Sequence, residues 1–111
     1  AKGLAITQVV PDPASRSTPL IREVQEAFDK FKPKDVTLNH TFVEGYVGAK
    51  ILGEGLRRAG ANPTRQKLRD TLEQLRDYDI GGQYVGFSPT NRVGMNYVDI
   101  TILNKEGKLL R

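Results

Sequence analysis

The segment that most constrains the fold runs from Asn39 to Gly60, NHTFVEGYVGAKILGEGLRRAG, and is the longest with a helical pattern. Its apolar residues recur at the three- and four-residue spacings of a packed helix. These residues are Phe42, Val43, Tyr46, Val47, Ile51, Leu52, Leu56 and Ala59. Asn39 or Thr41 can cap the start of this helix, and Gly60 suits its end. The pattern therefore predicts one long helix in the middle of the chain.

This helix also contains four glycines, Gly45, Gly48, Gly53 and Gly55. Each interior glycine costs a helix roughly 1 kcal/mol relative to alanine. The usual compensation is the close approach of a sheet or a second helix. We therefore interpret the segment as a central buried helix. On this interpretation Gly48→Leu should destabilise the fold more than Lys50→Leu, because Lys50 is expected to lie near water.

The length of 111 residues is enough for one small domain. The chain has no cysteine, which excludes a disulfide framework and thiol chemistry. Its 17 basic residues exceed its 13 acidic ones, but they are spread along the chain, which favours a solvated surface over a nucleic-acid site. No apolar run approaches the roughly 20 residues of a membrane span, so direct membrane insertion is not expected.

The first part of the chain predicts a strand, a stiff loop and a helix. Leu4–Val10 is rich in aliphatic and β-branched residues and is interpreted as a central buried strand whose neighbours are not evident. The prolines of Pro11–Pro13 end it in an extended connector. Thr18 and Pro19 are typical of a helix start, and an apolar stripe then continues to Phe31.

The last part predicts a third helix and a run of strands. Ala61–Pro63 is interpreted as a cap followed by a first-turn proline, before a narrow amphipathic helix. Short strands are expected near 84–87 and 96–104, and a hairpin-type turn at 105–108 leads into another strand at Leu109. The region around Tyr78 is interpreted as a loop. The expected order is β, α, α, α, β, β, β, an α/β arrangement of three helices with flanking strands. Since the first strand and these last strands would not make a good sheet alone, we expect the chain to be cut from a longer protein.

The sequence offers no set of catalytic residues. His40 is the only histidine, and without cysteine it cannot form a recognisable zinc site. A capping or cleft-lining role fits its position just ahead of the central helix. Ser88 is not in a nucleophile-elbow context, and Gly81-Gly82 is not part of a phosphate-binding loop. We therefore expect no enzymatic activity, no metal and no cofactor.

The order of several motifs resembles one protein family. These motifs are V-V-P-D-P after the first strand, E-G-Y-V-G-A-K-I-L in the central helix, R-R-A-G-A-N-P-T-R after it, G-F-S-P-T-N, and Y-V-D-I-T-I-L-N-K-E-G-K near the end. Together they are similar to the substrate-binding proteins of branched-chain amino-acid-type ABC transporters, the leucine/isoleucine/valine-binding class. The resemblance covers nearly the whole chain and corresponds to the last third of such a protein.

This resemblance implies the type 1 periplasmic-binding fold, in which two α/β lobes close over a ligand. Residues 1–10 would then hold a second-lobe strand, 11–83 mainly first-lobe helices, and 84–111 strands that cross between the lobes. The hinge would include Pro11, Asp12 and Pro13. The cleft-lining segment would be His40, Thr41 and Phe42, with Phe42 as the aromatic residue against the ligand side chain and His40 not essential. The alternative is that Phe42 is simply a core residue.

The resemblance further implies an amino acid or a similar small organic acid as ligand, a membrane permease as partner and a periplasmic location. The signal peptide and the groups that hold the ligand's carboxylate and amine would lie outside this chain. A ligand-sensing regulator of the same fold that binds a protein partner is the alternative. The upstream sequence would separate the two functions, since a signal peptide followed by the first lobe favours transport.

Overall fold

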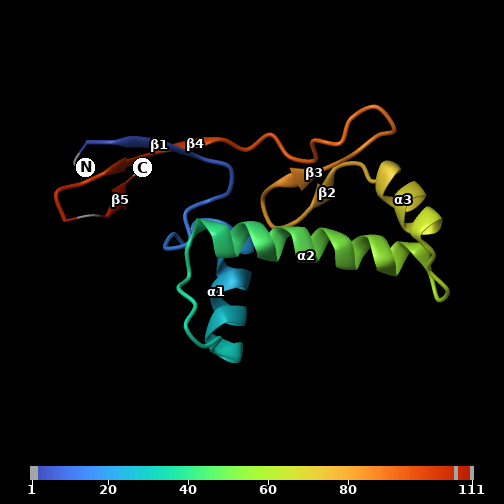
Figure 1. Ribbon diagram of the computed structural model, residues 1–111, viewed down its shortest axis with the longest axis horizontal. Coiled ribbons are helices and arrows are strands. Elements are labelled where there is room, and N and C mark those ends of the chain that lie inside the picture. Colours follow the sequence, from blue (N-terminus) through green and yellow to red (C-terminus); the bar gives the residue numbers. More distant parts are fainter. Residues whose placement is uncertain (1–2, 107, 111) are drawn as a thin grey trace.

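The computed structural model describes residues 3–106 and 108–110. The other elements lie around one long central helix (Figure 1). The elements in chain order are β1 (Ala5–Gln8), α1 (Pro19–Phe31), α2 (His40–Ala59), α3 (Arg65–Glu73), β2 (Tyr78–Asp79), β3 (Tyr84–Val85), β4 (Asp99–Leu103) and β5 (Leu109–Leu110). In Figure 1, α1 begins near the left half of α2 and runs downward away from it, and α3 lies beyond the β2–β3 hairpin towards the other end.

The start of each helix is fixed by a side-chain cap. Thr18 Oγ1 accepts a hydrogen bond from the Ile21 N–H before α1, and Asn39 Oδ1 accepts one from the Phe42 N–H before α2. Asn39 rather than Thr41 is thus the cap of α2. For α3 the expected cap at Ala61–Pro63 is wrong, because Thr64 accepts from the Lys67 N–H and the helix begins at Arg65.

One face of α2 packs against α1 and the β2–β3 hairpin, and the interpretation of the segment as a buried helix is wrong for its other side. Val43 and Val47 belong to the core, whereas Leu52 and Leu56 are 47% and 40% exposed. Among the four glycines of α2, only Gly55 is closely packed: an added Cβ would lie 2.8 Å from Leu72 Cδ2 of α3. At Gly48 an added Cβ would meet nothing within 4 Å.

A polar cluster joins α2 to α1 and to the β2–β3 turn. The ammonium group of Lys50 lies 2.8 Å from Glu23 Oε1 and donates to the Ile80 carbonyl at 2.9 Å. The Tyr46 hydroxyl donates to Glu23 Oε2 at 2.6 Å. Lys50 is therefore half-buried and bonded to two elements, not near water as the sequence interpretation expected.

These contacts reverse the expected ranking of two variants. We now expect Lys50→Leu to lower the urea midpoint more than Gly48→Leu, because it leaves the Ile80 carbonyl and part of Glu23 without partners, at about 1–3 kcal/mol. Gly48→Leu meets open space and removes a helix-weakening glycine. Urea titrations of both variants of this chain test the ranking, and a larger loss for Gly48→Leu would contradict it.

The first strand finds its partner at the other end of the sequence. β1 pairs antiparallel with β4, with Ala5 opposite Ile102 and Thr7 opposite Ile100, and β4 pairs antiparallel with β5. The sheet order is β1-β4-β5. The first strand therefore has a neighbour within this chain. The expectation of a buried first strand is wrong, because Leu4 and Val9 are about half exposed.

A second, two-stranded sheet lies against α1 and α2. β2 and β3 pair antiparallel, with Tyr78 opposite Val85, so the segment around Tyr78 is a strand and not the expected loop. Ile80 and Val85 are fully buried there beside Leu20 and Val24 of α1. The Gly81 carbonyl accepts from the Leu20 N–H at 3.0 Å, which ties this hairpin to the first turn of α1.

Within the described residues, no helix has the length and apolar character needed to cross a membrane.

Candidate functional site

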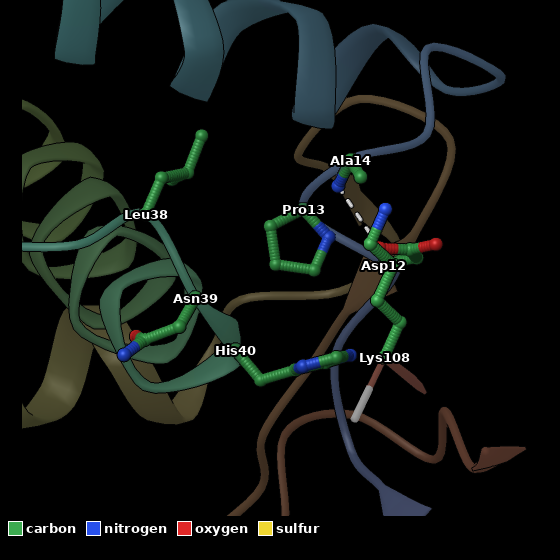
Figure 2. A pocket seen from close by; sticks show the side chains of 7 residues that line it. All are labelled: Asp12, Pro13, Ala14, Leu38, Asn39, His40 and Lys108. Carbon is green, nitrogen blue, oxygen red and sulfur yellow. Dashed lines mark hydrogen bonds between the residues drawn. The ribbon is translucent and has the colours of Figure 1, made fainter. Parts of the chain in front are cut away.

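A hollow of about 310 Å³ lies where the loop after β1, the start of α2 and the turn before β5 meet (Figure 2). Three separate parts of the chain line it. The lining residues are Asp12, Pro13, Ala14, Leu38, Asn39, His40 and Lys108. Figure 2 shows the His40 side chain extending toward the side of the hollow where Asp12 and Lys108 lie, whereas Asn39 points away from them.

The loop after β1, which forms one wall of the hollow, is fixed by its own prolines and local hydrogen bonds. Pro11 and Pro13 are buried, and proline fixes its own φ angle near −65°. Between them, Asp12 Oδ1 accepts a hydrogen bond from the Ala14 N–H at 2.9 Å, and the Asp12 carbonyl accepts from the Ser15 N–H at 3.1 Å. The Asp12 carboxylate is thus part of a tight turn as well as of the hollow.

The remaining walls come from the start of α2 and from the last hairpin. The Asn39 cap sets where α2 begins and so places His40 in its first turn. Lys108 follows the β4–β5 turn, in which its N–H donates to Asn104 Oδ1 at 2.8 Å. One carboxylate, one ammonium group and one imidazole therefore face a single hollow, which suits a small ligand with charged ends.

The structure separates the three residues predicted to contact a ligand. His40 lies in this first hollow together with Asp12 and Pro13, two of the predicted hinge residues. Thr41 and Phe42 line a different hollow of about 470 Å³, which is formed with 35–37 and Asn39. Phe42 is half-buried there, and its ring makes a T-shaped contact with that of Phe28, with the centroids 5.2 Å apart.

The polar cluster around Glu23 holds α2 in the position that forms these hollows. Burial opposes ionisation of Glu23, but hydrogen bonds from Lys50 and Tyr46 outweigh it and lower the pKa of this carboxyl group. Burial and the bond to Glu23 raise the pKa of the Tyr46 phenol to about 12. At neutral pH the cluster is therefore a carboxylate bonded to an ammonium group and to a neutral phenol, and it links α1 to α2.

Sequence reasoning named three of the residues that line this hollow, His40 as a cleft-lining residue and Asp12 and Pro13 as hinge residues. It did not bring them together, and it did not name Leu38, Asn39 or Lys108 as lining residues. Lys108 approaches His40 only because β5 joins the sheet of β1 and β4, which no local pattern shows. Over residues 3–106 and 108–110, no group of three or more acidic, histidine or cysteine side chains could hold a metal ion.

Comparison with known proteins places this arrangement in a family. A family model described as periplasmic binding protein matches residues 1–108. The chain belongs to the periplasmic binding protein family. Family membership confirms the resemblance of the motif order and the α/β type 1 periplasmic-binding fold that it implied. A comparison with curated protein sequences gave no match.

Solved structures of the family superimpose on almost the whole chain. A substrate-binding periplasmic protein from Ralstonia solanacearum is 39% identical with a TM-score of 0.88 over 99% of this chain. An extracellular ligand-binding receptor from Verminephrobacter eiseniae is 29% identical, with a TM-score of 0.85 over 100% of it. A possible leucine/isoleucine/valine-binding protein from Rhodopirellula baltica is 28% identical, with a TM-score of 0.86 over 99% of it. This chain spans 31%, 31% and 30% of those proteins, respectively.

Proposed function

We propose that this chain is part of a solute-binding protein that holds an amino acid or a similar small organic acid between two lobes. The family match over residues 1–108 carries the proposal. It is supported by the likeness to the Ralstonia substrate-binding protein and to the possible leucine/isoleucine/valine-binding protein. We further propose that the whole protein works outside the cytoplasm and delivers its ligand to the membrane permease of an ABC importer.

In this proposal the described residues supply one wall of the ligand site. Asp12 and Pro13 belong to the hinge loop, and the start of α2 lines the cleft. The charged ends of an amino acid suit the hollow that Asp12, His40 and Lys108 share. Phe42 supplies apolar contact to the ligand side chain from the neighbouring hollow. The protein acts by binding alone, since no nucleophile, base and orienting group converge in the described residues.

The proposal predicts that the isolated 111-residue chain binds amino acids weakly or not at all. A site between two lobes takes much of its contact from closure around the ligand, and only one wall is present here. The comparison protein is a chimera in which this chain replaces the matched part of the Ralstonia protein. We expect calorimetry with a panel of amino acids and small organic acids to give at least one micromolar ligand for the chimera and none for the isolated chain.

Two outcomes would contradict this proposal. Micromolar affinity in the isolated chain would mean that the complete site lies within these residues. A cooperatively folded chimera that binds none of the panel would argue against an amino acid or small organic acid as ligand.

A further inference from the structure

The end of α1 carries a basic and aromatic segment that projects from the molecule. Figure 1 shows α1 running away from α2, and no other element lies beside its last turn in that view. The segment continues from the helix into the following loop and has the sequence Lys-Phe-Lys-Pro-Lys. We call it the basic tip of α1, and it consists of Lys30, Phe31, Lys32, Pro33 and Lys34.

Phe31, the last residue of α1, is the apolar centre of the basic tip. It is 75% exposed, more than any other large apolar residue that the structure describes. The ammonium group of Lys30 lies 5.6 Å from the centroid of its ring, a cation–π contact that keeps one lysine beside the ring. A single exposed apolar residue is common on protein surfaces, and the charges around this one are what distinguish it.

The backbone gives the basic tip a defined shape. Lys32 has a φ angle of 44°, and its N–H donates to the Phe28 carbonyl at 2.9 Å, which ends the helix directly after Phe31. Pro33 fixes its own φ angle, and Asp35 has a φ angle of 58°. The chain therefore turns sharply after Phe31, and the lysines that follow stay near the ring.

The charges beside the ring are positive. Among the residues that the structure describes, no carboxylate forms an ion pair with any of the three lysines of the basic tip. Glu26 and Asp29 lie roughly 140° and 200° around the helix axis from Phe31, and so on the other side of α1. Asp35 lines the hollow of about 470 Å³ beside the start of α2. Even with both aspartates counted, residues 29–35 have a net positive charge.

We propose that the basic tip of α1 binds the surface of a membrane that contains anionic lipids. The Phe31 ring enters the boundary between headgroups and acyl chains, and the ammonium groups of the three lysines bind lipid phosphates. The long lysine stems keep these ammonium groups at headgroup level while the ring lies deeper. A projecting ring suits a fluid lipid surface, which needs no preformed pocket, and the lysines make an anionic surface the complementary one. The contact is peripheral and reversible, because one apolar anchor alone gives only marginal binding.

Tryptophan fluorescence tests this proposal, because the chain has no tryptophan of its own. Phe31→Trp places a reporter in the basic tip, and Tyr84→Trp places a control on β3, where Tyr84 is 63% exposed. Both variants are made in the 111-residue chain and in the Ralstonia chimera, and the emission of the parent protein is subtracted. The probes are vesicles of phosphatidylcholine alone and vesicles of phosphatidylcholine and phosphatidylglycerol in equal parts.

With the anionic vesicles we expect the emission from position 31 to shift to shorter wavelength and to be quenched by brominated acyl chains, because the ring leaves water. Emission from position 84 should stay unchanged, and vesicles of phosphatidylcholine alone should have little effect at either position. Added salt should weaken the binding, since it screens the attraction between the lysines and the lipid phosphates.

Two sets of substitutions, each made together with Phe31→Trp, test the role of the lysines. Replacing the three lysines of the basic tip with glutamine should weaken binding roughly a hundredfold, at about fivefold for each lysine. The matched control replaces three exposed basic residues of α3 with glutamine and changes the net charge equally. These residues are Arg65, Lys67 and Arg69. The control should leave binding within about twofold at physiological salt, where distant charges are screened.

Three outcomes would overturn the proposal. The first is unchanged emission from position 31 with anionic vesicles in a protein that unfolds cooperatively, which would leave a partner protein as the occupant. The second is an equal shift at positions 31 and 84, or equal binding by the two glutamine variants, since adsorption would then not depend on the basic tip. The third is emission of a buried tryptophan from position 31 in the chimera before vesicles are added, because the rest of the longer protein would then cover the ring. No solute is present in these measurements, so their result is independent of the proposed binding function.

Discussion

Replacing Gly81 with alanine is expected to cause a large loss of stability. Gly81 has a φ angle of +121°, and a Cβ placed on it would lie 2.5 Å from Leu20 N and 2.8 Å from Leu20 Cα. Both are backbone atoms of the first turn of α1, so no flexible side chain can move aside. Overpacking of this kind costs about 1–3 kcal/mol, and an unfavourable φ angle costs about as much again. Urea unfolding of the 111-residue chain measures the total loss in the free energy of unfolding.

Gly82→Ala is the matched control for this prediction. Gly82 also has a positive φ angle, +96°, but the nearest atom to an added Cβ is Pro19 Cδ at 3.6 Å, which is ordinary contact. Its loss of stability should therefore come from backbone strain alone and should be clearly smaller. Equal shifts of the urea midpoint for the two variants would mean that the close contact between the β2–β3 turn and α1 adds nothing to the loss of stability at Gly81.

Phe42→Ala in the Ralstonia chimera is expected to weaken binding of the ligand that the calorimetric screen identifies by about tenfold or more, on the order of 1–2 kcal/mol. The ring lines the hollow of about 470 Å³ beside the start of α2. It also makes a T-shaped contact with Phe28, so some stability is lost as well. Because Phe42 is only half-buried, this loss should be below the roughly 3–5 kcal/mol of a fully buried phenylalanine.

Phe28→Ala separates these two roles of Phe42. It removes the same aromatic pair, but Phe28 does not line the hollow. We expect it to reduce stability while leaving affinity per folded molecule nearly unchanged. A large drop in the unfolding midpoint for Phe42→Ala with unchanged affinity would place Phe42 in the core and remove it from the proposed ligand site.

The helices were predictable from sequence because their signals are local. The caps Thr18 and Asn39 lie three residues from the N–H groups that they accept from, and Gly60, at a φ of +97°, ends α2 where expected. The start of α3 was missed by a few residues because Asn62 and Thr64 are both good caps, and Pro63 favoured the earlier one. The spacing of apolar residues alone does not decide between two possible cap residues that lie two positions apart.

The sheet and the site were less predictable because they depend on contacts between distant segments. The pairing of β1 with β4 joins Ala5 to Ile102, and no local pattern in either strand specifies that partner. The four glycines of α2 predicted close approach of another element, but this prediction is confirmed only at Gly55, since an added Cβ at Gly45, Gly48 or Gly53 would meet nothing within 4 Å. For the same reason His40 was named from its position before a helix, whereas Lys108 entered the site only through the fold.

The sheet of β1, β4 and β5 has a mechanical consequence. Within the part of the chain that the structure describes, two stretches connect it to the helices, the loop 9–18 and the segment 86–98. If the sheet rotates relative to the helices, we expect the rotation to occur about the line that joins these two stretches. Asp12 lies in the first stretch, Lys108 directly precedes β5 of the sheet, and His40 is the first residue of α2 (Figure 2). A turn of the sheet about this line would therefore change the separation of His40 and Lys108 and would open or close the hollow between them.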